Sequence, residues 1–194
     1  MKRRTFDTVV SAVGVFLALV FVVAGSLLTW GHNFVTNEVH SQLAAQQIYF
    51  PPSNSAAVKG PQFAAMRKYG GQQLTTGAQA ETYADHFIAV HLREIGGGKT
   101  YAQLSSEAQA DPGNTNLAAE VDTVFKGETL RGLLLNAYAF GTMGTIAGWA
   151  AVGAFVAAAV MLIFGGLGFW HAHRTPDTAE ILTGRPTGTP TSTA

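Results

Sequence analysis

The stretch Val9–Trp30 reads VVSAVGVFLALVFVVAGSLLTW and contains no charged residue over 22 positions. As a helix rising 1.5 Å per residue it would be about 33 Å long, close to the hydrocarbon thickness of a bilayer. Trp30 falls where such a helix would leave the membrane, a level at which aromatic side chains are enriched. The stretch therefore predicts a transmembrane helix over residues 9–30.

Two other interpretations of this stretch stay open. It could be a cleaved export signal with Val22-Val23-Ala24 as the cleavage site, although the apolar sequence continues to Trp30. Arg3-Arg4-Thr5-Phe6 also matches part of a twin-arginine export signal, although Asp7 follows where an apolar residue is expected. We favour an uncleaved anchor because the stretch is long for a signal.

A second apolar region, Gly132–Trp170, has no charged residue over 39 positions, too many for one span with ordinary tilt. We favour a helix at 132–147 that lies outside the membrane or at its surface, followed by a transmembrane helix at 148–170. Trp149 and Trp170 would then mark the two interfaces. The alternative is a hairpin of two short spans, but the middle of the region has no Pro, Asn or Asp for a tight turn.

Positive residues flank both predicted spans and indicate their orientation. Lys2, Arg3 and Arg4 precede the first span, and His171, His173 and Arg174 follow the second. Because cytoplasmic flanks are enriched in positive charge, residues 1–8 and 171–194 are predicted to be cytoplasmic, and residues 31–147 extracytoplasmic. The tail 171–194 is rich in Thr, Pro and Gly and is predicted to be disordered.

The central segment shows helical spacing and no sustained alternation of the kind that strands show. Residues 32–48 are expected to continue the first helix, and residues 61–69 to form a short one. The clearest helix is 76–95, whose predicted buried face is Ala80, Tyr83, Ala84, Phe87, Ile88, His91, Leu92 and Ile95. The fold class predicted is an all-α membrane protein, with two transmembrane helices flanking an extracytoplasmic helical domain.

Local signals predict where these helices begin and end. Gly96 is expected to end helix 76–95 in a left-handed conformation. Thr100, three residues before Gln103, predicts a capped helix to about Ala110. Thr115 or Asn116 is expected to cap the next helix, which Gly127 would weaken.

Charge and motifs exclude several partners. Twelve acidic and twelve basic residues balance, and no basic stripe is present, so nucleic acid is not a predicted partner. The chain has no cysteine, which excludes disulfides and thiolate chemistry within it. Gly98-Lys99-Thr100 matches the end of a phosphate-binding loop, but Arg93 stands where that motif needs a glycine, and a helix precedes it instead of a strand. No nucleotide is predicted.

No catalytic residue and no cofactor are predicted. The chain has no G-x-S-x-G nucleophile motif. The metal-ligand candidates are His86, His91, Asp85 and Glu94, which the sequence brings together only in pairs, whereas a metal site needs three or more converging ligands. We favour structural or solvated roles for all four.

Small residues on the second apolar region predict a helix-packing face. Gly144 and Gly148 form a G-x-x-x-G pair, and Ala150, Ala154 and Ala158 recur every fourth residue. The favoured partner of this face is the first span of the same chain. A second copy or another membrane protein is the alternative.

The segment QLTTGAQAETYADHFIAVHL (73–92), together with IGGGKTY (95–101), FKGETLRGLL (125–134) and the opening MKRRTFD, resembles a family of small actinobacterial two-span membrane proteins of unknown function. The resemblance covers nearly the whole chain except the tail. It implies a bacterial plasma membrane and this two-pass topology. Some members carry the label aromatic ring-opening dioxygenase, a chemistry that needs iron held by two histidines and a carboxylate, and no such triad is evident here.

Three functional hypotheses follow. The first is a non-catalytic accessory or scaffolding subunit of a larger membrane, envelope or respiratory complex, with other membrane subunits or a second copy as partners. The second is a binding module for a lipid- or quinone-type ligand, in which the uncharged segment 132–147 forms one wall of an apolar pocket. The third is a metal-dependent membrane enzyme that uses the four candidates above.

Overall fold

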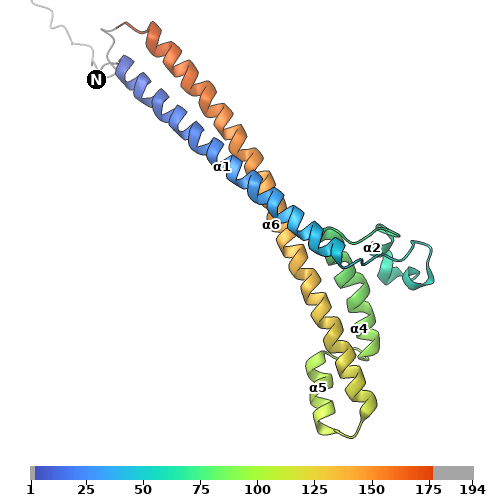
Figure 1. Cartoon of the computed structure of the whole chain (residues 1–194). Helices are drawn as coiled ribbons and strands as arrows, with labels where there is room; N and C mark the ends of the chain where they lie inside the picture. The colour runs from blue at the N-terminus through green and yellow to red at the C-terminus, as the bar shows by residue number, and fades with distance from the viewer. Residues whose placement is uncertain (1–2, 177–194) are drawn as a thin grey trace, which may run out of the picture. The chain divides into compact units, whose positions relative to one another are not determined.

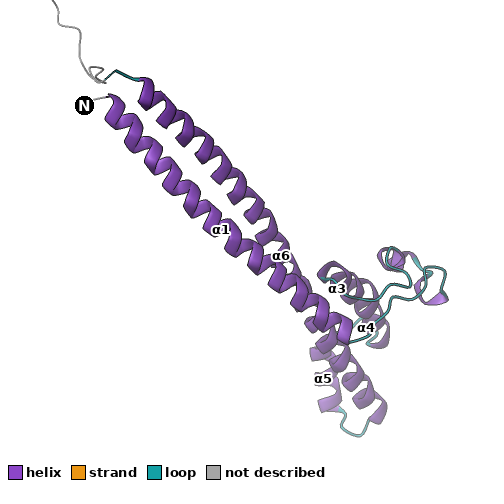
Figure 2. Cartoon of the chain, turned by 45° about the horizontal axis from the view of Figure 1, so that its top comes forward, coloured by secondary structure: helices purple, strands orange, loops and turns teal. Residues whose placement is uncertain are grey.

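The computed structural model describes residues 3–176, and within them every regular element is a helix (Figures 1 and 2). Two long helices, α1 (Arg3–Ala45) and α6 (Thr115–Arg174), are the first and last elements in the sequence, and the shorter elements come between them. These are the 3-10 turns η1 (Ala56–Val58) and η2 (Pro61–Phe63), α2 (Ala64–Arg67), α3 (Gly77–Tyr83), the π-helical turn η3 (Ala84–Ile88), α4 (Ala89–Ile95) and α5 (Tyr101–Ala110). The predicted all-helical fold is confirmed.

The chain divides into two compact units, Met1–Thr29 with Trp149–Ala194, and Trp30–Gly148. We call the first the span pair and the second the helical domain. Both α1 and α6 are long and apolar enough to cross a membrane. The division falls within a residue of the predicted domain-side ends of the two spans, at Trp30 and Gly148.

In the span pair, α1 and α6 run antiparallel and pack through small residues that recur every seven positions (Figure 1). A Cβ atom placed on Gly165 would lie 3.0 Å from Val15 Cγ2 and 3.3 Å from the Ser11 carbonyl oxygen. A seven-residue repeat keeps one face toward the partner when two helices wrap around each other. The buried small residues are Ser11, Ala18 and Gly25 on α1, and Ala151, Ala158, Gly165 and Ala172 on α6.

This repeat corrects part of the predicted packing face. Gly144 and Ala158 are buried, but Ala150 is exposed, Ala154 is half-buried and Ala151 is buried instead. A four-residue step drifts about 40° around a helix, whereas a seven-residue step drifts only about 20°. A face repeating every fourth residue therefore turns away from the partner after two steps.

Many large apolar side chains of the span pair are exposed and lie outside this contact. Phe16 and Leu27 on α1 are 64% exposed, and Phe164 on α6 is 66% exposed. An uncharged surface of this kind suits hydrocarbon rather than water.

The core of the helical domain is a chain of aromatic rings surrounded by aliphatic side chains. The Phe50 ring lies 5.2 Å from that of Tyr69 and 5.4 Å from that of Tyr83, which in turn lies 4.9 Å from Phe87. The buried aliphatic residues around them include Leu43 of α1, Val58, Met66, Leu74 and Leu134 of α6. The shared core fixes the short helices against both long ones.

The predicted helix 76–95 contains a π-helical turn that its sequence does not announce. The Ala89 N–H donates to the Ala84 carbonyl oxygen, five residues back. A π turn holds more residues per turn than an α-helix, so four-residue spacing stays on one face. Ala80, Ala84, Ile88 and Leu92 are all buried, as predicted, but Ile95 is 44% exposed because the helix ends there.

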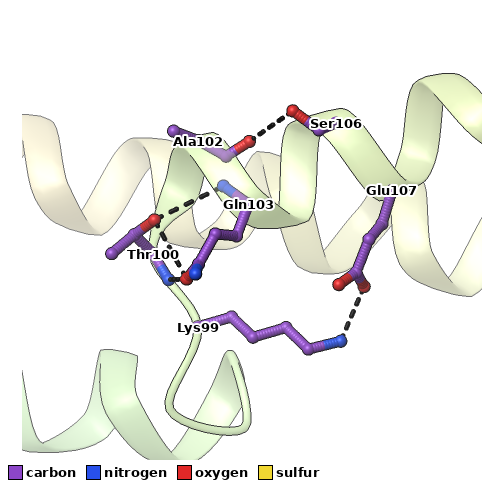
Figure 3. A network of polar contacts seen from close by, with 6 residues as sticks. All are labelled: Lys99, Thr100, Ala102, Gln103, Ser106 and Glu107. Carbon is purple, nitrogen blue, oxygen red and sulfur yellow. Dashed lines mark hydrogen bonds and ion pairs between the residues drawn. The ribbon is translucent and has the colours of Figure 1, made fainter.

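Glycines end α4, although not in the predicted way. Gly96 has a φ of −82°, and the left-handed positions are Gly97 (φ 56°) and Gly98 (φ 83°). The turn leads directly into the predicted capping box of α5. The Thr100 hydroxyl accepts from Gln103 N, and the Thr100 N–H donates to Gln103 Oε1 at 2.9 Å (Figure 3). Thr76 and Gln79 form a second box of the same kind at α3.

Helix α6 is continuous from Thr115 to Arg174, so the apolar region 132–170 contains no turn. The alternative hairpin of two short spans is wrong. The cap is Asn114, whose Oδ1 accepts from Leu117 N at 3.1 Å, one residue before the predicted position. At the other end, residues 171–174 of the predicted disordered tail are the last turn of α6, and residues 177–194 of that tail lie outside the described residues.

Candidate functional site: a cavity in the helical domain

The helical domain contains an open cavity of about 290 Å³ between α1, the start of α3 and α6. Its lining, within the described residues 3–176, has no carboxylate, lysine or arginine. The lining residues are His32, Thr36, Val39 and His40 of α1, Thr75 to Ala78 at the start of α3, and Tyr138, Gly141, Thr142 and Thr145 of α6. The cavity is therefore a neutral site whose surface is mostly apolar and also carries hydroxyl and imidazole groups.

His32 is the most firmly placed polar side chain of this lining. Its Nδ1 lies 2.7 Å from the carbonyl oxygen of Gly144. A carbonyl oxygen can only accept, so Nδ1 carries the proton and donates it, and neutral His32 keeps Nε2 as an acceptor. A Cβ placed on Gly148 would lie 3.0 Å from Nδ1, so this glycine makes room for the ring.

Glycine pairs bring the other walls together. A Cβ placed on Gly77 would lie 3.1 Å from the Ala137 carbonyl oxygen and 3.3 Å from Gly141 Cα. The backbone of α3 thus touches the backbone of α6 directly. Gly144 lies against a side chain of α1, because a Cβ there would lie 3.2 Å from Val35 Cγ1. The predicted face at Gly144 and Gly148 therefore packs against α1 of the same chain.

Some hydroxyl groups around the cavity form hydrogen bonds inside the protein. Thr145 donates to the Gly141 carbonyl oxygen at 3.0 Å. Thr75 and Thr76 direct their hydroxyls to Gln79 Oε1 at 3.4 Å and 3.2 Å. Thr145 can therefore present an acceptor to the cavity, whereas the hydroxyl groups of Thr36, Tyr138 and Thr142 can either donate or accept there.

The four metal-ligand candidates are engaged separately or exposed. Asp85 accepts a hydrogen bond from Arg131 of α6 at 2.9 Å, which raises the pKa of Arg131 above its ordinary value. His91 donates from Nδ1 to the Phe87 carbonyl oxygen at 2.7 Å. His86 and Glu94 are exposed. Within residues 3–176, no three potential ligands lie close enough together to hold a metal ion.

The glycine-lysine-threonine motif is engaged in helix capping. Lys99 forms an ion pair with Glu107 at 2.6 Å, one side of the network in Figure 3, and Thr100 caps α5. Both side chains that would hold a phosphate in the related motif are thus directed to α5.

The prediction of a pocket wall at 132–147 placed one side of the cavity, but it missed the residues opposite. His32, Thr36 and His40 recur every fourth residue on α1, a spacing that places them near one face of a helix. That spacing was the signal from which these cavity residues could have been predicted. It gives no information about the contact between His32 and Gly144, 112 residues away.

Comparisons of this chain with protein-family models, with curated proteins and with solved structures give no match.

Proposed function

We propose that this chain is a two-pass plasma-membrane protein that acts as a non-catalytic accessory or scaffolding subunit of a larger membrane, envelope or respiratory complex. In this proposal both termini are cytoplasmic and the helical domain is extracytoplasmic. The positive residues Arg3, Arg4, His173 and Arg174 at one end of the span pair support this orientation.

The observation that carries the proposal is the excess length of apolar helix in α6. Its uncharged run Gly132–Trp170 is 39 residues, or about 58 Å at 1.5 Å per residue. A bilayer covers roughly 30 Å of it. The 16 residues of the run before Gly148 therefore need another cover on their outer side.

One side of that segment faces the domain core, and the other is bare. Leu133, Phe140, Met143 and Ile146 are 61%, 57%, 62% and 63% exposed, and we call them the outer strip. The partner proposed for the outer strip is an apolar surface of another membrane protein.

A photo-crosslinking amino acid at the outer strip tests this proposal. Benzoylphenylalanine replaces Phe140 in one variant and Tyr49 in the other, since both side chains are aromatic and 57% exposed. In native membranes we expect the Phe140 variant to form one defined adduct with a different membrane protein, and the Tyr49 variant to form none. Adducts with lipid alone, or equal labelling from both positions, would contradict the proposal. An adduct with a second copy would replace it by self-association.

The second candidate function is binding of a lipid- or quinone-type ligand. The observation favouring it is the cavity of about 290 Å³, one wall of which belongs to segment 132–147. Ligand pockets usually measure some 300 to 1,000 Å³, so this one suits a head group rather than a whole lipid.

A further inference from the structure

We infer that the cavity binds the neutral, hydroxyl-bearing head group of a membrane amphiphile, such as a sugar or glycerol head, and that His32 Nε2 accepts a hydrogen bond from it. The inference rests on the second proposed function and on the proposed membrane position.

The hydrogen-bond arrangement of the lining selects the chemistry of the ligand. His32 donates its Nδ1 proton to the Gly144 carbonyl oxygen, and Thr145 donates its hydroxyl proton to the Gly141 carbonyl oxygen. His32 and Thr145 can therefore each offer the cavity an acceptor without breaking a bond inside the protein, and the Thr36, Tyr138 and Thr142 hydroxyls can donate or accept. A ligand whose groups both donate and accept, as the hydroxyl groups of a polyol do, is the complement of such a lining.

The absence of charged residues from the lining narrows the class of ligand further. The lining has no carboxylate to balance a cationic head group, and no lysine or arginine to balance a phosphate. Burying an unpaired charge is costly, so a neutral head group is favoured over both. A quinone carbonyl only accepts, so unlike a hydroxyl group it cannot donate a hydrogen bond to His32 Nε2.

The position of the cavity along α1 and α6 indicates a membrane source. His32 is two residues after Trp30, and Gly148, which touches it, is followed by Trp149. These tryptophans are 68% and 74% exposed, as expected of side chains at the membrane–water interface. The head group of an embedded amphiphile lies at that level.

The test measures binding of a neutral glycolipid to the full-length protein in a zwitterionic detergent that has no hydroxyl group. The probes are monoglucosyl-diacylglycerol, phosphatidylcholine and free methyl glucoside, and native mass spectrometry gives each affinity. We expect the glycolipid to bind in preference to the other two. The ¹⁵N signal of His32 Nε2 should shift on binding, whereas that of His91 should not.

Matched variants separate recognition from folding. His32→Phe and Thr145→Val remove an acceptor each and should weaken glycolipid binding about tenfold, as loss of one hydrogen bond does. His91→Phe and Thr123→Val remove the same kinds of backbone-directed bond outside the cavity and should leave affinity unchanged. Thr145 is exposed on α6, so Thr145→Val keeps the test valid if His32→Phe does not fold.

The outcomes are distinct. Variants that bind as the wild type does, or a protein that binds no probe, would overturn the inference. Equal affinity for glycolipid and methyl glucoside would support hydroxyl recognition and overturn the membrane source. The Phe140 crosslink does not depend on any of these results.

Discussion

At the residue scale, Tyr83 shows how packing changes the chemistry of a side chain. Its ring meets the edge of Phe50 and packs against Phe87, and burial raises its pKa above the ordinary value of 10.0. The neutral phenol is therefore favoured in the folded domain and the phenolate in the unfolded chain. Below pH 10 both states keep the proton, and this contribution to stability is complete.

Stability of the helical domain is therefore expected to fall as pH rises above about 10, because the unfolded chain loses the Tyr83 proton first. Tyr83→Phe should flatten this fall, and Tyr49→Phe, a change at an exposed ring, should not. Thermal melts followed by near-ultraviolet circular dichroism between pH 8 and about 11 measure the fall of stability in the wild type and in both variants. Lysine deprotonation affects all three proteins alike. Identical pH profiles would refute the assignment.

Two glycines of α6, Gly127 and Gly132, have different surroundings that the sequence does not distinguish. The sequence predicts that Gly127 weakens its helix, yet α6 runs through it unbroken, and a Cβ there would lie 2.3 Å from Leu92 Cδ2. Gly132, five residues on, has nothing within 4 Å. The two glycines look alike in the sequence because the residue that distinguishes them lies on α4.

At the element scale, helix ends were largely predictable and helix contacts were not. Thr100 with Gln103 is a local signal, and α5 begins where it predicts. The seven-residue repeat on α6 also lies in the sequence, but a four-residue repeat overlaps it at Ala158. Only the partner helix decides between them, because Ala150 and Ala151 are equally small.

The antiparallel register of the span pair predicts a specific disulfide. A Cβ on Gly168 would lie 3.3 Å from Ser11 Cβ, near the separation that disulfides span. The double variant Ser11→Cys, Gly168→Cys should oxidise readily, and Ser11→Cys, Gly166→Cys should not, since nothing lies within 4 Å of Gly166. The chain has no other cysteine. After cleavage at a protease site inserted beside the exposed Gly113, fragments that stay joined without reductant report the bond. Equal crosslinking of both pairs would rule out this register.

At the scale of the whole molecule, the spacing and length of the apolar runs were enough to predict the all-helical fold and the two candidate spans. They were not enough to predict the cavity. His32 carries no local signal for a partner 112 residues away, and Gly77 meets Gly141 only because α3 and α6 share the domain core. The site depends on tertiary contacts that no spacing rule contains.

Cysteine labelling tests the proposed topology of the whole chain. Gln109→Cys places a thiol at an exposed position on α5, and Thr187→Cys places one in the C-terminal tail. A membrane-impermeant maleimide should label the first in intact cells and the second only after lysis. Labelling of Thr187→Cys from outside would reverse or abolish the proposed two-pass arrangement.

The bond between His32 and Gly144 also determines when the cavity can exist during synthesis. Its two ends are 112 residues apart, which a ribosome adding about 5 to 20 residues per second takes roughly 6 to 22 s to make. During that interval the nascent first helix waits without its partner. Its contact face, Ser11, Ala18 and Gly25, stays uncovered even longer, because the residues that pack against it lie at 151–172 of α6. The first helix is therefore complete well before the helix that packs against it.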